Sequence, residues 1–437
     1  MKKILLFSLY SICILFKVHS QLPNPVLVGY WHNWSIPEAP YIQLNQIDSR
    51  YNVIEVSFAV PTSPSDMTMT FTPDGITQQQ MITQINQLKA AGKKIIISIG
   101  GATTSIDLST TVNKSAFITS MTNIINTYGF DGIDIDIEHG NSIMITSGGS
   151  ISNVSNNPAM QNLIDAIKQI MSNYRQNHPN KLILTMAPET AYVQGGQSGF
   201  GSIWGGYLPI IHALRDSLDI LQVQLYNSGT MYGIDNNIYT QGTADFIIAM
   251  TEAVIQGFNT NGGFFTGIAA SKVAVGLPAC PLAAGGGFTD TNSVMAAIKY
   301  LRGNGPKPGN YTLVQSGGYP NLRGMMTWSI NWDAVSNCGT VYQFARNFQN
   351  IFLNSTNINF YGNETNDFQV FPNPAENIII IKTKSISNNF LYIYNSSGIL
   401  VSEKQLLKDE NEIDLSDLPT GLYLLKNNNS IQKIIKQ

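Results

Sequence analysis

Charged residues are scarce in this chain. Lys, Arg, Asp and Glu make up 12% of the 437 residues, and the formal net charge is -3. Charged residues are about a quarter of an ordinary soluble domain. No basic run favours nucleic acid or an anionic membrane surface as a partner, so we expect neither. A surface made polar mainly by amide and hydroxyl side chains suits a neutral, hydroxyl-rich ligand instead.

Cysteines are also few, at positions 13, 280 and 338. Cys13 lies in a segment that we expect to be removed, so Cys280 and Cys338 remain. These two leave open a single disulfide bond or two buried thiols, and they are too few for a disulfide framework. No His, Cys and Asp cluster has metal-ligand spacing, so we expect no metal and no other cofactor.

Apolar runs long enough to span a bilayer, which takes roughly 20 residues, are missing. The apolar stretch at 4–16 follows Lys2 and Lys3 and precedes Val18-His19-Ser20. A basic start, a short apolar stretch and a small residue at the end predict a secretory signal over residues 1–20. A membrane anchor is the alternative. We expect no membrane span once the signal is removed.

Short apolar runs alternate with helical patterns over residues 21–353. The predicted strands are 26–30, 53–59, 94–99, 132–137, 182–186, 220–225, 273–277 and 324–330. The predicted helices are 78–91, 115–128, 159–174, 207–218, 243–256, 291–301 and 342–352. This alternation predicts an α/β fold with parallel strands, and eight strands in roughly 330 residues fit a (β/α)8 TIM barrel. A doubly wound open sheet is the runner-up, but no Gly-x-Gly-x-x-Gly follows the first strand.

The composition changes after the barrel. Residues 354–366 are rich in Asn, Thr and Ser and predict a linker. Only strand patterns follow in 367–437, at 368–371, 377–383, 390–395, 399–403, 411–415 and 421–426. Turn residues separate these runs, which predicts a small, independent antiparallel β-sandwich.

Three segments of this tail carry a specific pattern. They are Val-Phe-Pro-Asn-Pro-Ala at 370–375, Leu-Tyr-Ile-Tyr-Asn at 391–395 with Gly398, and Leu-Pro-Thr-Gly-Leu-Tyr at 418–423. In this order they resemble the C-terminal sorting domain of type IX secretion cargo. The resemblance implies the type IX machinery as a partner and a secreted or cell-surface protein of a Gram-negative bacterium. An accessory sandwich, such as a carbohydrate-binding module, is the alternative.

The most informative segment is 131–138, Asp-Gly-Ile-Asp-Ile-Asp-Ile-Glu. Because side chains alternate along a strand, Asp134, Asp136 and Glu138 share one face, with Glu138 roughly 7 Å beyond Asp136. In a barrel this places Glu138 at the C-terminal mouth, where active sites lie. Three crowded carboxyls in a poorly solvated interior cannot all ionise cheaply, so one holds a proton and can act as a general acid. A calcium site and a solvated edge strand are alternatives, which the intervening isoleucines disfavour.

The Asp-x-x-Asp-x-Asp-x-Glu pattern resembles the signature of family 18 glycoside hydrolases, the chitinase family. Further matches lie at predicted strand ends: Tyr30-Trp31, Ser98-Ile99-Gly100-Gly101, Met186-Ala187-Pro188-Glu189, Gln224-Leu225-Tyr226-Asn227 and the segment from Trp328 to Asp333. The resemblance covers residues 25–352. It implies a chitinase that hydrolyses β-1,4 bonds between N-acetylglucosamine units by a substrate-assisted, retaining route through an oxazolinium intermediate.

The family's residue roles carry over by position. Glu138 would be the general acid, Asp136 would hold the substrate acetamide, Asp134 would share a proton with Asp136, and Tyr226 would bind the acetamide oxygen. Trp328 resembles the floor beneath the sugar. The other implied residues are Tyr30, Met186, Glu189, Gln224 and Asn227 as substrate contacts, and Asp131 and Ser98 as supporting residues. Met186 is equally well interpreted as a filler of the barrel interior.

The segment between the last two predicted strands is short, about 45 residues including a helix. It has no room for the additional α+β insertion of many processive family members, which predicts an open cleft and endo-type cutting. An endo-β-N-acetylglucosaminidase acting on glycoprotein glycans is the main alternative. A non-catalytic chitin-binding lectin is a weaker one, because Glu138 is present. We expect a monomer.

Overall fold

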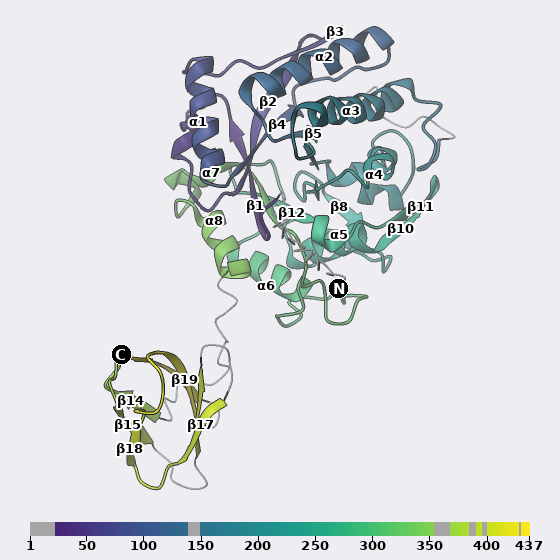
Figure 1. Ribbon diagram of the computed structural model, residues 1–437. Coiled ribbons are helices and arrows are strands. Elements are labelled where there is room, and N and C mark those ends of the chain that lie inside the picture. The colour runs from purple at the N-terminus through teal and green to yellow at the C-terminus, as the bar shows by residue number, and fades with distance from the viewer. Residues whose placement is uncertain (1–21, 139–148, 354–367, 384–389, 396–399, 428–429) are drawn as a thin grey trace, which may run out of the picture. The chain divides into compact units, whose positions relative to one another are not determined.

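Figure 1 shows the computed structural model, which describes residues 22–138, 149–353, 368–383, 390–395, 400–427 and 430–437. The predicted signal at 1–20 and the predicted linker at 354–366 lie outside the described residues. The chain divides into two compact units, with the boundary between residues 354 and 355, and we describe each by itself. Among the described residues, no helix has the length and apolar character needed to cross a membrane.

The first unit is a barrel of parallel strands. Its strands are β1 (Val26–His32), β2 (Val53–Ser63), β4 (Lys94–Gly100), β5 (Gly132–Asp136), β6 (Ile183–Met186), β7 (Ile220–Leu221), β12 (Ala274–Pro278) and β13 (Gly324–Trp328). They are hydrogen-bonded in the order β12-β13-β1-β2-β4-β5-β6-β7. Parallel bridges from Leu221 to Val273 and from Gln224 to Gly276 bring β7 against β12 and close the ring. The predicted TIM barrel is therefore confirmed.

Helices surround the strands (Figure 1). They are α1 (Gln78–Ala90), α2 (Thr111–Tyr128), α3 (Pro158–Asn177), α4 (Leu208–Leu214), α5 (Ala244–Gln256), α6 (Thr291–Leu301) and α8 (Gln343–Phe348). Five of them begin after a capping side chain that accepts a backbone N–H of the first turn: Thr77, Thr110, Asn157, Thr243 and Asp290. Such caps satisfy otherwise unpaired donors and fix where each helix starts.

Several short elements were not predicted. The hairpin strand β3 (Asp66–Thr70) extends β2, and the short helix α7 (Ile330–Asp333) follows β13. Two small hairpins pair β8 (Thr230–Tyr232) with β9 (Ile238–Thr240) and β10 (Gly257–Thr260) with β11 (Gly263–Thr266). These elements are too short to show a hydrophobic period, which is why the sequence pattern does not reveal them.

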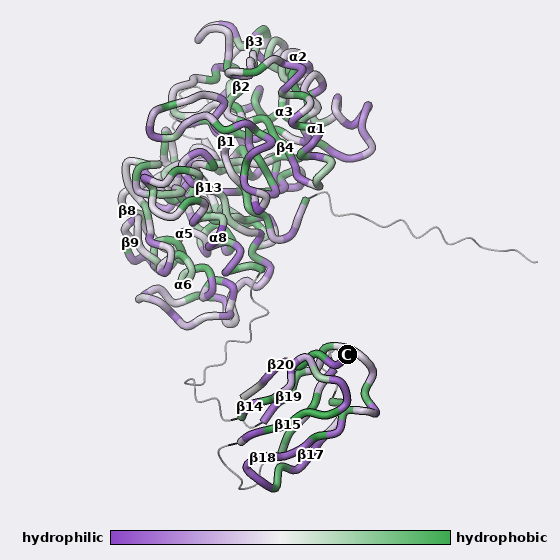
Figure 2. The backbone as a smooth tube through the Cα atoms, turned by 90° about the vertical axis from the view of Figure 1, so that its left-hand side faces the viewer, coloured by the Kyte–Doolittle hydropathy of each residue, from purple (hydrophilic) through white to green (hydrophobic). Residues whose placement is uncertain are grey.

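Side chains of the barrel strands point alternately into two apolar layers. Ile133, Ile135 and Ile137 of the acid-bearing segment are fully buried in the main core, together with helix residues such as Met121 and Ile167. Fully burying one such side chain contributes about 1.5–3 kcal/mol. The opposite parity lines the barrel interior, where the apolar residues include Val28, Ile96, Ile183 and Met326. Figure 2 shows apolar segments concentrated inside the unit. The helix-facing side of β5 anchors the strand and leaves its interior face for polar groups.

The second unit is a small all-β domain. One sheet contains β14 (Phe368–Phe371), β15 (Ile378–Thr383) and β18 (Glu410–Asp414), and the other contains β17 (Leu400–Gln405), β16 (Phe390–Asn395), β19 (Gly421–Asn427) and β20 (Ser430–Lys436). All neighbouring strands are antiparallel. Ile379, Ile393 and Leu425 lie in its buried core. The predicted sandwich is confirmed, but β20 was missed because two adjacent isoleucines break its alternation.

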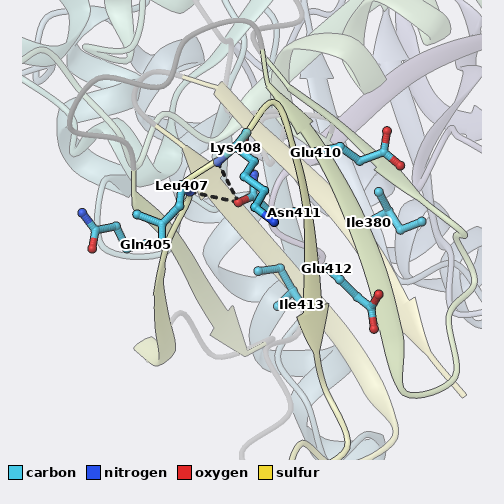
Figure 3. A pocket seen from close by; sticks show the side chains of 8 residues that line it. All are labelled: Ile380, Gln405, Leu407, Lys408, Glu410, Asn411, Glu412 and Ile413. Carbon is cyan, nitrogen blue, oxygen red and sulfur yellow. Dashed lines mark hydrogen bonds between the residues drawn. The ribbon is translucent and has the colours of Figure 1, made fainter.

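A pocket of about 570 Å³ lies where the chain passes from β17 to β18 (Figure 3). The Asn411 carboxamide oxygen accepts the backbone N–H groups of Leu407 and Lys408 at 2.9 and 3.2 Å and so shapes the turn. None of the predicted site residues lines this pocket. It is a feature of the turn, and we assign no chemistry to it.

Candidate active site

The three acids of the predicted site climb one strand from the barrel interior to its mouth. Asp134 is fully buried and Asp136 is 2% exposed, both on β5. Glu138 follows the end of the strand and is partly exposed. The main-core isoleucines lie between these acids in sequence and on the other face, so the structure has the alternation that the sequence predicts.

Asp134 is held by three hydroxyl groups. Tyr30 OH and Ser98 Oγ each donate to Asp134 Oδ2 at 2.7 Å, and Thr185 Oγ1 lies 2.7 Å from Oδ1. Burial raises the pKa of Asp134, and these hydroxyl contacts partly oppose the shift. Tyr30 and Ser98 therefore contact Asp134, the acid that lies deepest in the barrel.

One amide group joins the other two acids. Gln224 Nε2 lies 2.8 Å from Asp136 Oδ1, 3.1 Å from Glu138 Oε1 and 3.0 Å from the Ala187 carbonyl oxygen. Burial raises the pKa of Asp136 well above its usual value, and the negative charges of Glu138 and Asp134 raise it further. Each of these effects penalises the charged carboxylate. Asp136 is therefore favoured in its protonated form.

The backbone that carries Glu138 is clamped from two sides. Tyr207 OH accepts the Ile137 N–H at 2.7 Å and donates to the Ile137 carbonyl oxygen at 2.8 Å. On the other side, Gly101 N–H donates to the Asp136 carbonyl oxygen at 2.6 Å. A Cβ atom on Gly100 would lie 2.3 Å from that same oxygen. Only glycine permits this close approach of β4 to the acid-bearing strand.

The other predicted substrate contacts, Tyr226, Glu189 and Asn227, differ in how far they are exposed to solvent. Tyr226 is 6% exposed, and burial, followed by the charges of Asp136 and Glu138, raises its pKa well above the usual value. Glu189 is partly exposed, and its charge also raises the Tyr226 pKa. Asn227 is exposed, but its side-chain oxygen accepts the Gly286 N–H at 3.1 Å. Asn227 therefore anchors the loop after β12 by a hydrogen bond.

Met186 is the predicted contact that the structure does not bring to the site. Its neighbour Thr185 points into the barrel toward Asp134, so Met186 points to the other side of β6. The Met186 side chain is fully buried in the main core. Met186 is therefore a residue of the core between strands and helices, and not the filler of the barrel interior that the sequence left open.

Aromatic rings surround a pocket of about 520 Å³ at the C-terminal ends of β1, β4 and β13. Trp34, Phe58 and Trp328 line it, with small polar residues of β2, of β3 and of the segments after β3 and β4. The Phe58 and Trp328 rings are stacked with centroids 6.2 Å apart, and Trp328 lies 5.6 Å from the Tyr30 ring. His32 stacks on Trp34 at 4.6 Å, and burial lowers its pKa to about 3, which keeps its imidazole neutral. Flat apolar rings of this kind suit the C–H faces of sugar rings.

The other tryptophans have different environments. Trp31 is fully buried in the main core, and Trp332 packs in a small cluster with Cys280. Trp204 lies in a loop and is 39% exposed. A disulfide joins Cys280 to Cys338 and so links the loop after β12 with the segment after β13.

Asp131 supports the start of the acid-bearing strand. Its carboxylate lies 3.0 Å from Lys89 Nζ and accepts the Ile95 N–H at 3.0 Å. These contacts join α1, β4 and β5 below the acids. Asp131 therefore has a structural environment below the acids.

Sequence reasoning missed several buried polar residues around the acid-bearing strand. They are Glu55 on β2, Thr185 on β6, Gln222 after β7 and Tyr207 before α4, all fully buried. Glu55 could have been found, because it is a single acid in the apolar run Val-Ile-Glu-Val-Ser at 53–57. Over the described parts of the chain, no group of three or more His, Cys, Asp or Glu residues could hold a metal ion.

Known proteins resemble the chain in both units. The glycosyl hydrolases family 18 model matches residues 26–376, and the secretion system C-terminal sorting domain model matches residues 369–437. Chitinase D of Niallia circulans is 44% identical over 315 residues, which are 71% of this chain and 59% of that protein. Chitinase Chi52 of Paenibacillus xylanexedens is 44% identical over 325 residues, or 73% of this chain and 61% of that protein. The chain thus spans about three fifths of the length of these relatives.

A solved structure shares the barrel. The crystal structure of a family 18 chitinase from Chromobacterium violaceum matches with a TM-score of 0.66 and 35% identity, over 75% of this chain and 83% of that one. The tail match confirms the predicted sorting domain, which marks a secreted or cell-surface protein of a Gram-negative bacterium. The family match spans the whole barrel, including the acid-bearing strand. This chain is a member of glycosyl hydrolase family 18 and carries a C-terminal secretion sorting domain.

Proposed function

We propose that this protein is a secreted chitinase that hydrolyses β-1,4 bonds between N-acetylglucosamine units of chitin and chitooligosaccharides. The observation that carries the proposal is the pair Asp136 and Glu138, joined by the Gln224 amide at the barrel mouth. The names of the relatives, chitinases at 44% identity, support chitin as the substrate. The sorting domain supports export by the type IX machinery.

The proposed reaction begins with a proton transfer. Glu138 protonates the bridging oxygen while the carbonyl oxygen of the substrate's own N-acetyl group attacks the anomeric carbon. The bond from the anomeric carbon to the bridging oxygen breaks, and an oxazolinium ion forms. Glu138, now ionised, takes a proton from water, whose oxygen opens the oxazolinium ring with retention of configuration. The partly exposed position of Glu138 at the end of β5 suits contact with both substrate and water.

The neighbouring residues would hold the acetamide during this step. Asp136 accepts its N–H and, once its proton passes to Asp134, stabilises the developing positive charge as a carboxylate, while Tyr226 donates to the acetamide oxygen. Asp134 shares a proton with Asp136 from below. The raised pKa of Asp136 supports a stored proton here, and the buried Tyr226 hydroxyl is held neutral by its own raised pKa.

The pocket beside Trp34 and Trp328 would receive a further sugar unit, with Trp328 beneath the unit that reacts. Between β12 and β13 the described chain contains α6 and loops but no strand. This short connection favours an open cleft, so the proposed cutting is of the endo type, within the polymer.

The deciding experiment compares the wild type with Glu138→Gln on chitooligosaccharides. We expect kcat to fall by about 10²–10⁴-fold, because that is the usual contribution of a general acid. Binding of the oligomer, measured by calorimetry, should persist because the amide keeps the shape of the side chain. Glu403→Gln on the exposed β17 is the matched control and should leave kcat unchanged. Near-normal turnover by Glu138→Gln would refute the role of Glu138.

Substrate and stereochemistry are tested in the same preparation. The wild type should release new ends from chitin oligomers far faster than glycans from a high-mannose glycoprotein, and the reverse order would favour the endo-β-N-acetylglucosaminidase. NMR of the first product should show the β-anomer. Rapid loss of long chains, before small products accumulate, would support endo-type cutting.

A further inference from the structure

A fourth carboxyl group, Glu55, lies fully buried inside the barrel near the three acids. Gln222 Nε2 lies 2.6 Å from Glu55 Oε1 and 2.7 Å from Oε2. Thr185 Oγ1 lies 2.9 Å from Glu55 Oε1 and, on its other side, 2.7 Å from Asp134 Oδ1. Glu55 on β2 is thus connected to Asp134 on β5 through the hydroxyl of Thr185 on β6.

The Thr185 hydroxyl cannot donate a hydrogen bond to both Glu55 and Asp134. A hydroxyl group has one hydrogen to donate, whereas an ionised carboxylate can only accept. Thr185 can therefore donate to one of its two carboxyl neighbours, and the other must donate to Thr185 Oγ1 for both contacts to be hydrogen bonds. At least one of Glu55 and Asp134 consequently carries a proton.

The remaining contacts indicate which of the two holds it. Asp134 also receives the hydroxyl groups of Tyr30 and Ser98, which stabilise a charged carboxylate. Besides Thr185, Glu55 contacts the neutral Gln222 amide. The Tyr30 hydroxyl, which donates to Asp134 Oδ2 at 2.7 Å, has a smaller effect that lowers the Glu55 pKa. Burial raises the pKa of Glu55 well above its usual value, and the Asp134 charge raises it further, which agrees with a proton on Glu55.

We propose that Glu55 is a positioning residue that donates a proton to Thr185 and, through Thr185, holds Asp134 as the charged carboxylate beneath Asp136. The inference rests on the proposed function, since Asp134 acts on the reaction through Asp136. An ionised Asp134 favours a proton on Asp136, because its negative charge raises the Asp136 pKa. Glu55 thereby sets the protonation of the acids above it without touching the sugar.

The titratable groups that interact with Glu55 come from three directions. Asp134 and Asp136 face it from β5, Tyr30 from β1, and Tyr226 from the segment after β7. All carry either a negative charge or a hydroxyl that burial keeps neutral. The charges of Asp134 and Asp136 disfavour ionisation of Glu55, and burial outweighs the Tyr30 hydroxyl, which lowers the Glu55 pKa.

Three variants test the chain of hydrogen bonds. Glu55→Gln retains one donor and one acceptor and so imitates the protonated acid, and it should keep kcat and the pH profile within about twofold of the wild type. Glu55→Met removes the donor, and Thr185→Val breaks the connection while Glu55 remains. Both should lower kcat about tenfold with little change in KM, the effect of losing one hydrogen bond to a charged group.

The pH profile separates this role from a structural one. Loss of the donor makes the ionised form of Asp134 less stable and raises its pKa. The acidic limb of kcat should therefore move to higher pH by about one unit in Glu55→Met and Thr185→Val. The control is Glu252→Gln on α5, another fully buried glutamate, which accepts the Tyr311 and Tyr319 hydroxyls. This control should change stability and leave the acidic limb in place.

An infrared measurement reports the proton on Glu55 without any turnover. The wild type at neutral pH should show a protonated-carboxyl band that Glu55→Gln removes, and a difference spectrum without that band would overturn the proposal. So would a Glu55→Gln enzyme as impaired as Glu55→Met, or a Thr185→Val enzyme with the wild-type acidic limb. A wild type that does not cleave chitooligosaccharides would refute the proposed function instead, and the infrared result would still decide the state of Glu55.

Discussion

Removal of one hydroxyl group, in Tyr207→Phe, tests how firmly the barrel must hold its proposed acid. Tyr207 OH bonds both the N–H and the carbonyl oxygen of Ile137, the residue before Glu138. Both residues are fully buried, so water does not replace the lost partner. Leaving a buried backbone group without its partner costs about 1–3 kcal/mol. We expect the variant to lose about 3 kcal/mol of unfolding free energy.

That loss can be converted into measurable quantities. An unfolding entropy of about 2.1 cal/mol/K per residue over roughly 330 residues gives a Tm decrease of roughly 4 °C. A displacement of about 1 Å at a catalytic group lowers the rate by about 10²-fold, so even a fraction of that shift at Glu138 should reduce kcat clearly. KM should change little, because Tyr207 does not reach the aromatic pocket. Differential scanning calorimetry and turnover of chitooligosaccharides measure the two effects.

A matched substitution distinguishes positioning from general destabilisation. Tyr311→Phe also removes a buried hydroxyl, which donates to Glu252 Oε2 at 2.7 Å. It should lower Tm similarly and leave kcat unchanged at temperatures where the protein is folded. If Tyr207→Phe also kept its full kcat, the clamp on Ile137 would serve stability alone, and the argument that it orients Glu138 would be wrong.

Three further predictions follow from the same strand and its surroundings. Gly100→Ala should abolish activity and lower the yield of folded protein, because the new Cβ would lie 2.3 Å from the Asp136 carbonyl oxygen; a soluble, active variant would contradict the close packing. Reduction of the Cys280–Cys338 disulfide, which closes a loop of 58 residues, should lower the unfolding free energy by about 2–4 kcal/mol, and thermal unfolding with and without reductant should show it. The raised pKa of Asp136 contributes stability that is present below the usual pKa of 3.8 and lost as pH rises through the folded-state pKa. Asp136→Asn should therefore flatten this decline of the unfolding free energy with pH by up to about 1.4 kcal/mol per pH unit, measured by denaturant titration. An unchanged slope would contradict the pKa shift.

The elements with a strong period could be predicted from the sequence. All eight barrel strands lie at the predicted runs, and α1, α5 and α6 end within one residue of their predicted bounds. The two-residue period of a strand also predicted correctly that Asp134 and Asp136 face the interior and the isoleucines face the helices. These features depend on local geometry, which a short stretch of sequence specifies completely.

Contacts across the barrel could not be predicted in this way. Thr185 and Glu55 are 130 residues apart, and Gln222 and Glu55 are 167 residues apart. Whether two interior side chains meet depends on the tilt and stagger of strands around the ring, which strand patterns leave open. Tyr207, which precedes α4, bonds the backbone of Ile137 from 70 residues away, and the strand pattern leaves this loop contact open as well. The proposed acids were therefore predictable, whereas the groups that hold them were not.

The barrel interior balances its acids with protons and neutral donors in place of cations. Within the described chain, Glu55, Asp134 and Asp136 form no ion pair, and their partners are the hydroxyls and amides of residues such as Thr185 and Gln224. Acids outside the interior do pair, as Asp131 does with Lys89. A lysine or arginine beside Asp136 would favour its charged form and lower its pKa, which would remove the stored proton. Neutral donors orient a carboxyl group and leave its proton in place, so an interior without cations follows from the proposed chemistry.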